Sequence, residues 1–269
     1  MARIPIIGLA GKAGSGKSTV AKYIADKYNA VEVAQADVMK RFIWRVFDNF
    51  TIEDLWGPSE LRNKSVDLTF DESRIYFNFT ETINPWLDHL LENKSDINNA
   101  KKRIEKWLDN DICPKLKAIT PRYLLQSLGT EVVRNFKPTV WSDHAIATAF
   151  NLLTPNWRYE RAIGLIRESN RKPYNFVVIS DVRFLNECLN INKINGINIL
   201  IKRPDLVKLV GEAGNHSSET ELDTIPKHFF DTIVWNDGSL QSLYGRIDEI
   251  VKKYYPQMTS SVPYLRVED

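Results

Sequence analysis

Residues 11–18 have the types and spacing needed to bind a phosphate chain. They read Gly-Lys-Ala-Gly-Ser-Gly-Lys-Ser, which fits the phosphate-loop pattern G-x-x-x-x-G-K-[ST]. Glycines let the backbone close around a phosphate group where a Cβ atom would block it. Lys17 is predicted to contact the β- and γ-phosphates of a nucleoside triphosphate, and the Ser18 hydroxyl to bind Mg²⁺.

The residues on either side of this pattern have the local structure that it requires. Residues 4–10 form a short apolar run of strand character, and residues 19–25 have apolar side chains at helical spacing. A strand, a glycine-rich turn and a helix N-terminus direct backbone N–H groups and the helix dipole to one point. A chance match in a glycine-rich turn is the alternative, and the flanking elements argue against it. The predicted triphosphate-binding residues are Gly11, Ala13, Gly14, Ser15, Gly16, Lys17, Ser18 and Thr19.

Composition limits the class of protein. The chain has 269 residues, of which 43% are hydrophobic, so a sizeable core is expected and disorder is not. A formal net charge of +2 argues against stable nucleic-acid binding. Two cysteines far apart in sequence favour a reducing compartment and offer no metal-ligand spacing. No apolar stretch has membrane-spanning length, and residue 1 leads directly into the first strand without a signal peptide. We therefore expect a cytoplasmic enzyme without membrane partners.

Strand and helix patterns alternate at both ends of the chain and predict an α/β fold with a parallel sheet. Between about residues 41 and 172 the pattern is mostly helical, which predicts a large insertion into a single domain. The core is expected at about residues 1–40 and 173–256. Beyond the first strand, strands are predicted at residues 30–34, 176–180, 197–201 and 232–235.

A second group of candidate residues follows the apolar run at 176–180. Asp181 ends this predicted strand, where a carboxylate can hold Mg²⁺. Arg183 lies two residues further on, at the start of the next helix, and Glu187 could brace it as an i,i+4 pair. The alternative is that Asp181 only caps the helix and that the Arg183–Glu187 pair is on the surface.

A helix is predicted to begin with Thr120 as N-cap and Pro121 at its first position, and to end at about Arg134. Its predicted buried residues are Leu124, Leu125, Leu128 and Val132.

The opposite side of this helix is polar. Arg122, Gln126 and Thr130 are spaced i, i+4 and i+8, with Glu131 nearby. Arg can bind a phosphate through two hydrogen bonds, Gln can read a base edge, and Trp141 could stack on a base. This group could therefore bind an acceptor nucleotide. The alternative is an ordinary amphipathic helix with a solvated face and with Trp141 in the core.

These residues together resemble the deoxynucleoside monophosphate kinases of bacteriophages, which are P-loop proteins related to nucleoside monophosphate kinases. The resemblance implies a three-layer P-loop fold with a helical acceptor-binding insertion and a lid at about residues 203–222. The matching residues are 11–18, 55–62, 120–122, Leu125, Gln126, 129–131, Arg134, Trp141, 180–184, Asn186 and Glu187, with 216–219 resembling the lid.

The resemblance also implies an activity. The γ-phosphate of ATP would move to a deoxynucleoside monophosphate (dNMP), giving dNDP and ADP with Mg²⁺ as cofactor. Arg122, Gln126 and Trp141 would face the acceptor, and Asp181, Arg183 and Glu187 would belong to the active centre together with Lys17. Small nucleotides would be the partners, a homodimer the assembly, and the host cytoplasm the location of a phage-encoded enzyme.

Some assignments stay open from sequence alone. Arg203 is the expected lid arginine on the ATP side, with Arg158, Arg161 and Arg171 as alternatives. Asp37 follows the second strand, where relatives approach the acceptor, and could instead be a helix N-cap. Residues 72–117, base choice and the discrimination of deoxyribose from ribose have no matching motif.

Other P-loop classes are alternatives. Residues 54–57 fit D-x-x-G and residues 93–96 fit N-K-x-D, as in switch GTPases. Each motif should follow a buried strand, whereas the preceding residues show none, which argues against a GTPase. A nucleotide-gated binding or motor module is also possible, since the P-loop is shared so widely. A small-molecule kinase of the same fold, of the dephospho-coenzyme A or phosphomevalonate type, is the stronger alternative.

Overall fold

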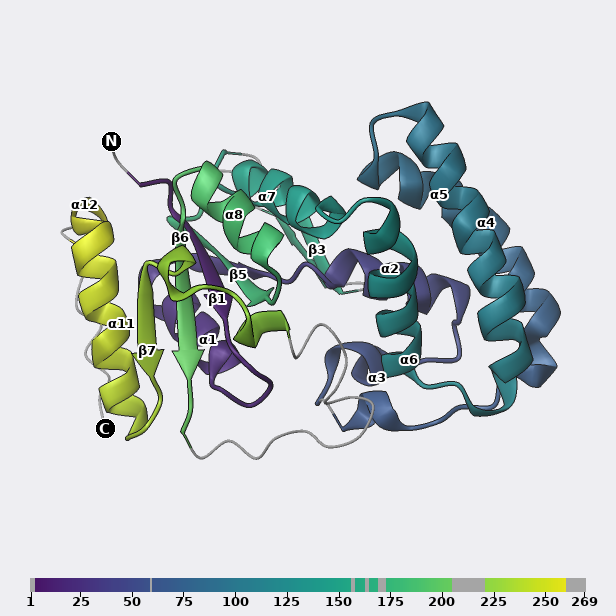
Figure 1. Cartoon of the computed structure of the whole chain (residues 1–269), viewed down its shortest axis with the longest axis horizontal. Coiled ribbons are helices and arrows are strands. Elements are labelled where there is room, and N and C mark those ends of the chain that lie inside the picture. The colour runs from purple at the N-terminus through teal and green to yellow at the C-terminus, as the bar shows by residue number, and fades with distance from the viewer. Residues whose placement is uncertain are drawn as a thin grey trace. The chain divides into compact units, whose positions relative to one another are not determined.

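The computed structural model describes residues 3–58, 60–155, 158–162, 165–168, 173–204 and 221–259. Figure 1 labels the helices and strands along the chain. The chain divides into two compact units, which we call the sheet unit and the helical unit. The sheet unit comprises Met1–Ala34, Ala145–Arg158 and Glu168–Asp269, and the helical unit comprises Gln35–His144 and Tyr159–Arg167.

The sheet unit contains a five-stranded sheet with the order β2-β5-β1-β6-β7. Every neighbouring pair of strands in it is parallel. The predicted α/β fold with a parallel sheet is therefore confirmed. The strands are β1 (Ile6–Ala10), β2 (Ala30–Val33), β5 (Phe176–Val182), β6 (Ile197–Lys202) and β7 (Thr232–Trp235).

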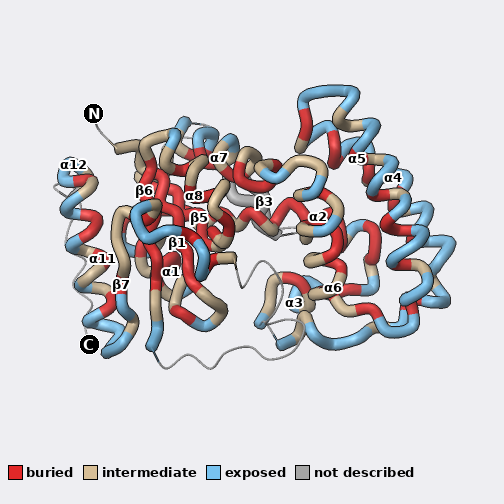
Figure 2. The backbone as a smooth tube through the Cα atoms, viewed as in Figure 1, coloured by how far each residue is buried: buried red, intermediate tan, exposed pale blue. Residues whose placement is uncertain are grey.

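Helices cover both faces of this sheet. α1 (Lys17–Tyr28) and α11 (Leu240–Tyr254) share a buried core with alternate residues of β1 and β6 on one face. α8 (Leu185–Lys193) covers the other face, where a Cβ on Gly8 would come within 2.6 Å of Ile191 Cδ1. β1, β2, β5 and β6 are almost continuously buried, as Figure 2 shows, whereas only Val234 is buried in the edge strand β7. Strands buried on both faces read as unbroken apolar runs, which is why the sequence pattern located them.

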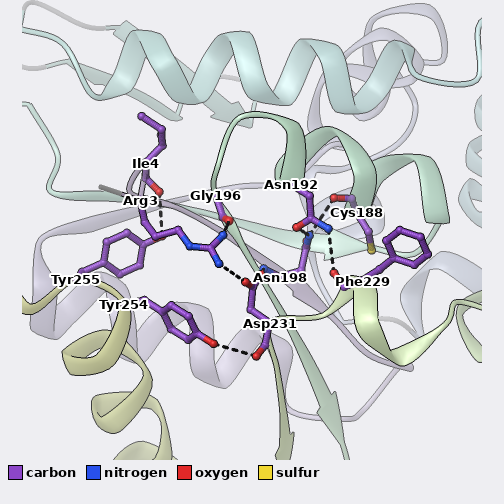
Figure 3. Close-up of polar contacts among 10 residues, drawn as sticks. All are labelled: Arg3, Ile4, Cys188, Asn192, Gly196, Asn198, Phe229, Asp231, Tyr254 and Tyr255. Atoms are coloured by element: carbon purple, nitrogen blue, oxygen red, sulfur yellow. Dashed lines mark hydrogen bonds and ion pairs between the residues drawn. The ribbon is translucent and has the colours of Figure 1, made fainter. Parts of the chain in front are cut away.

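A polar cluster joins the amino ends of the strands (Figure 3). Arg3 Nη2 lies 2.6 Å from Asp231 Oδ1, and Asp231 Oδ2 accepts a 2.9 Å bond from Asn198 N. The Asn198 side chain donates to the Cys188 carbonyl at 3.0 Å and to Asn192 Oδ1 at 2.9 Å. This amino-end cluster ties the segments before β1 and β7 to β6 and α8.

The helical unit is built from helices around an aromatic core. Phe42 stacks on Trp86 with ring centroids 4.4 Å apart, and Phe47 meets Trp107 edge-on. Large aromatic side chains bury much apolar area per residue and suit a core without a sheet. The helices are α2 (Asp37–Val46), α3 (Ile52–Trp56), α4 (Glu72–Leu90), α5 (Lys94–Trp107), α6 (Pro121–Gln126) and the first residues of α7 (Val140–Leu152).

The helix that begins at Thr120 differs from its prediction in one respect. Thr120 Oγ1 accepts a 3.1 Å bond from Tyr123 N, so the predicted N-cap is confirmed. After α6 the backbone continues as a π-helix from Ser127 to Arg134. The wider turn rotates the later residues, so Val133 is buried where the prediction named Val132. Leu125 is half-buried and packs against the core, so its predicted burial is only partial.

Two short strands were missed by the sequence analysis, which predicted mostly helix up to about residue 170. β3 (Arg158–Ala162) and β4 (Leu165–Glu168) form a separate two-stranded sheet. Their sequences are short and rich in charge, so they lack the apolar alternation that indicates a strand. Most of the predicted lid, residues 205–220, lies outside the described residues. Among the helices that are described, none has the length and apolarity to span a membrane.

Candidate active site

The phosphate loop lies between β1 and α1, as predicted. Three of its glycines adopt positive φ angles, a region that side chains with a Cβ rarely enter. Gly16 is also the N-cap of α1, so the loop leads directly into the positive end of a helix dipole. The three φ values are 153° at Gly11, 77° at Gly14 and 105° at Gly16.

Lys17 is folded back onto this loop. Its Nζ donates to the Gly11 carbonyl at 2.5 Å and to the Lys12 carbonyl at 2.8 Å. These two bonds keep the ammonium charge at the loop, where a polyphosphate would need it. Ser15 is buried, and its Oγ has no hydrogen-bond partner among the described residues. Ser18, at the start of α1, is exposed and can offer its hydroxyl to a ligand.

Asp181 lies beside the loop through strand pairing. β5 continues to Val182, which pairs with Ala10 at the end of β1. Asp181, the residue before Val182, is therefore near the carboxyl edge of the sheet, where β1 leads into the phosphate loop. The alternative role as a helix cap was wrong, because the N-cap of α8 is Phe184.

Glu187 fixes the main chain at Arg183. The residue is 4% exposed, and its Oε2 accepts the N–H groups of Arg183 at 2.7 Å and Phe184 at 3.0 Å. A carboxylate at a helix N-terminus is stabilised by free N–H groups and by the helix dipole. Glu187 therefore holds the backbone from which the half-buried Arg183 side chain extends.

The donor set in the sheet unit suits Mg²⁺. Ser18 and Asp181 offer a hydroxyl and a carboxylate oxygen, and Mg²⁺ usually takes one or two protein oxygens while keeping several waters. Within the described ranges, no three His, Cys, Asp or Glu side chains are grouped to hold a metal by themselves.

Asp37 is the most buried candidate of the helical unit, at 2% exposed. It is the first residue of α2, and the N-cap of that helix is Ala36, so the alternative role of Asp37 as an N-cap was wrong. Its Oδ1 accepts from Trp56 Nε1 at 3.0 Å and lies 3.6 Å from Lys40 Nζ. The Asp37 carboxylate thus contacts side chains of both α2 and α3.

The predicted acceptor face has mixed burial. Arg122, Gln126 and Thr130 are half-buried, and Glu131 is exposed. Arg122 Nε donates to Asn63 Oδ1 at 2.6 Å. Asn63 was not among the predicted site residues, although it directly follows the matching residues 55–62.

Trp141 is a core residue rather than an open stacking surface. It is 5% exposed, its ring lies 6.0 Å from that of Trp86, and its Nε1 donates to the Gly129 carbonyl at 3.0 Å. Its burial argues against the predicted contact with a base. The bond connects α7 to the π-helix, to which Gly129 belongs.

Trp141 is one of four tryptophans in the helical unit that use the indole N–H in the same way. Each donates to α2 or to the helix that begins at Thr120, where the acceptor candidates lie. The pairs are Trp56 with Asp37, Trp86 with the Val38 carbonyl, Trp107 with Ser127 Oγ and Trp141 with the Gly129 carbonyl.

The lid arginine is not assigned by the structure. Arg203 is exposed, directly after β6. The side chains of the alternatives Arg158, Arg161 and Arg171 lie outside the described residues. At the far end of the predicted lid, Asp223 Oδ2 lies 2.5 Å from Lys12 Nζ of the phosphate loop.

Each of the two GTPase-like motifs includes a helix-capping residue and follows no strand, as the sequence analysis expected. Asp54 accepts from the Thr51 N–H and forms the capping box of α3. Asn93 is the N-cap of α5 and accepts from Ser95 N at 2.8 Å. Neither motif follows a strand, so neither forms a guanine-binding or switch element.

Comparison with known proteins decides among the kinase classes. A family model described as deoxynucleotide monophosphate kinase matches residues 5–247. The chain belongs to the deoxynucleotide monophosphate kinase family.

Two curated viral members of the deoxynucleotide monophosphate kinase family are similar over most of their length. A protein of Acanthamoeba polyphaga mimivirus, provisionally named deoxynucleotide monophosphate kinase, is 25% identical over 243 residues, covering 90% of this chain and 93% of its own. The deoxynucleotide monophosphate kinase of Enterobacteria phage T4 is 24% identical over 264 residues, covering 92% and 98%. A solved dephospho-CoA kinase from Campylobacter jejuni, 13% identical over 93% of this chain and 97% of its own, has a TM-score of only 0.35.

Proposed function

We propose that the protein transfers the γ-phosphate of ATP to a deoxynucleoside monophosphate, giving a deoxynucleoside diphosphate and ADP. The observation that supports this most directly is a phosphate loop with Asp181 beside it, in a chain of the deoxynucleotide monophosphate kinase family. A phosphate loop alone is compatible with many reactions, and family membership selects among them.

In the sheet unit, the loop N–H groups and Lys17 bind the β- and γ-phosphates of the donor. Ser18 and Asp181 would hold Mg²⁺, which supplies neutralisation of the charge on the donor phosphates when bound. Arg183, held at its backbone by Glu187, adds a positive charge that stabilises the transferring group. Arg203 is proposed to contact ATP from the start of the lid.

In the helical unit, Arg122 is proposed to bind the acceptor phosphate and Gln126 its base. Thr130, Glu131 and Asp37 complete the proposed acceptor surface. The acceptor oxygen is already anionic at neutral pH, so no strong general base is required. The protein therefore acts by positioning the reactants, neutralising charge and excluding water.

The direct test is ADP release with ATP and Mg²⁺ against the four dNMPs, the four NMPs and dephospho-coenzyme A. Turnover with at least one dNMP, lost in Arg183→Ala and retained in the exposed control Lys22→Ala, is the expected result. Turnover with dephospho-coenzyme A alone, or equal ATP hydrolysis without any acceptor, would contradict the proposal. The predicted homodimer is tested separately, by the mass of the protein in solution.

A further inference from the structure

The loop that follows β7 contacts the phosphate loop through one side chain. Asn236 Nδ2 donates to the Ser15 carbonyl at 3.0 Å. The backbone N–H of Asn236 donates to the Lys202 carbonyl at the end of β6, at 2.7 Å. Asn236 therefore connects the carboxyl ends of two strands to the middle of the phosphate loop.

This bond fixes the direction of a backbone N–H group. Ser15 and Gly16 share one peptide plane, in which the C=O and N–H bonds point in opposite directions. A donor on the Ser15 carbonyl therefore holds the Gly16 N–H on the other side of the plane. Rotation of this peptide would turn a carbonyl dipole toward a bound phosphate and would break the bond to Asn236.

Gly16 is a position where such rotation is otherwise easy. It has φ 105° and ψ 9°, and it lies at the N-cap of α1. Glycine tolerates many backbone conformations, so an outside contact is needed to select one of them. A Cβ on Gly16 would come within 2.6 Å of Asn236 Nδ2, which shows how closely the amide packs against the loop.

Asn236 is itself held in place by its neighbours. Arg246 on α11 binds the Asp237 carboxylate at 2.8 Å and also the Trp235 carbonyl. The residues before and after Asn236 are thus tied to α11, while its own N–H is tied to β6. The Asn236 side chain therefore extends to the phosphate loop from a backbone segment that is held at both sides.

We propose that Asn236 is a positioning residue that keeps the Gly16 N–H directed at the phosphates of the donor nucleotide. This inference rests on the proposed function in that the donor is a nucleoside triphosphate. It predicts that loss of the amide weakens binding of the phosphates and leaves binding of the nucleoside part unchanged.

The test compares three ligands on the full-length protein: inorganic tripolyphosphate, ATP and adenosine. Asn236→Ala is expected to weaken tripolyphosphate and ATP about tenfold, the effect of one misplaced hydrogen bond to a charged group, without changing adenosine binding. In steady-state kinetics the KM for ATP rises and the KM for the dNMP does not. Asn236→Asp, which has the same shape but cannot donate and is anionic, is expected to have the larger effect.

Ser239→Ala is the matched control, because Ser239 caps α11 from the same loop without a bond to the phosphate loop. It is expected to lower the Tm while leaving the affinity for tripolyphosphate unchanged. Equal weakening of adenosine and ATP by Asn236→Ala, or unchanged tripolyphosphate affinity, would overturn the positioning role. A wild-type protein that binds tripolyphosphate but phosphorylates no dNMP would contradict the proposed function alone.

Discussion

The sheet unit and the helical unit position their candidate residues by different physical means. In the sheet unit many of the candidate binding groups are backbone N–H groups of a loop shaped by three positive-φ glycines between a strand and a helix. In the helical unit the candidates are side chains on α2 and on the helix that begins at Thr120. Those helices are held by indole N–H bonds from buried tryptophans such as Trp86 and Trp107.

This difference determines whether a substitution can change activity without changing stability. The side chains of Lys17 and Ser18 in the phosphate loop are not in the core, so activity can be lost there while stability is retained. In the helical unit, the groups that position the acceptor candidates are also core residues. Changes there are expected to alter stability and acceptor affinity together.

The largest expected effect is that of Lys17→Ala in the sheet unit. Loss of the ammonium group is expected to lower kcat by about 10²–10³-fold, as for removal of one preorganised charge-stabilising donor. The Tm should change little, because Lys17 is half-buried and its Nζ donates to the Gly11 and Lys12 carbonyls of its own loop. Kinetics and thermal unfolding measured on one preparation test this, and a Tm that falls in parallel with kcat would contradict it.

The next effect is acid sensitivity in the helical unit. Desolvation by burial, with smaller contributions from His89 and Arg41, lowers the pKa of His144 to about 4. Its unfolded value is about 6.5, so the unfolded chain binds the proton first and stability falls as the pH drops from about 6.5 to 4. Once the pH is below about 4, this histidine lowers the free energy of unfolding by about 3 kcal/mol. Desolvation by burial also lowers the pKa of His89, which adds to the acid sensitivity.

Urea unfolding at pH 7.5 and pH 5 measures this acid sensitivity. His144→Gln is expected to flatten the dependence on pH. His228→Gln changes an exposed residue of the sheet unit and is the matched control. It should not change how the free energy of unfolding depends on pH. A slope that is the same in all three proteins would show that other groups cause it.

A smaller effect is expected for Trp107→Phe. The change removes the indole bond to Ser127 Oγ and part of a fully buried ring, at a cost of about 2 kcal/mol. Because Ser127 begins the π-helix beside Gln126, the KM for the dNMP is expected to rise while the KM for ATP does not. Ser127→Ala removes the same bond without the large cavity. If either variant raised the KM for ATP alone, the proposed link between the helical unit and acceptor binding would be contradicted.

The smallest effect is expected in the amino-end cluster of the sheet unit. Asp231→Asn keeps the shape but removes the charge that Arg3 meets at 2.6 Å, at a cost of about 1 kcal/mol. Kinetic constants should not change, because the cluster lies at the opposite ends of the strands from the phosphate loop. Asp26→Asn, an exposed change on α1, is the control for net charge. Altered ATP affinity in Asp231→Asn would show that the two ends of the sheet are coupled.

The sequence predicted those features that depend on local rules. The phosphate loop, the buried strands and the Thr120 cap follow from spacing, apolar runs and capping chemistry within a few residues. The rotation of the π-helix was not predictable in this way, because it accompanies contacts from Met39 and Trp141, which are distant in sequence. Asn236 was missed for the same reason, since its role depends on a contact with residue 15 across the fold.

The strand order has a consequence for synthesis of the protein. β1 pairs with β5 and β6 and has no bond to β2, which joins the sheet only through β5. β1 and β2, the first strands to leave the ribosome, therefore cannot pair with β5 until more than half of the chain has been made. During that interval residues 35–144 can fold through contacts among themselves. Apolar residues of β1 and β2 stay exposed meanwhile, so the nascent chain depends on protection from aggregation until β5 emerges.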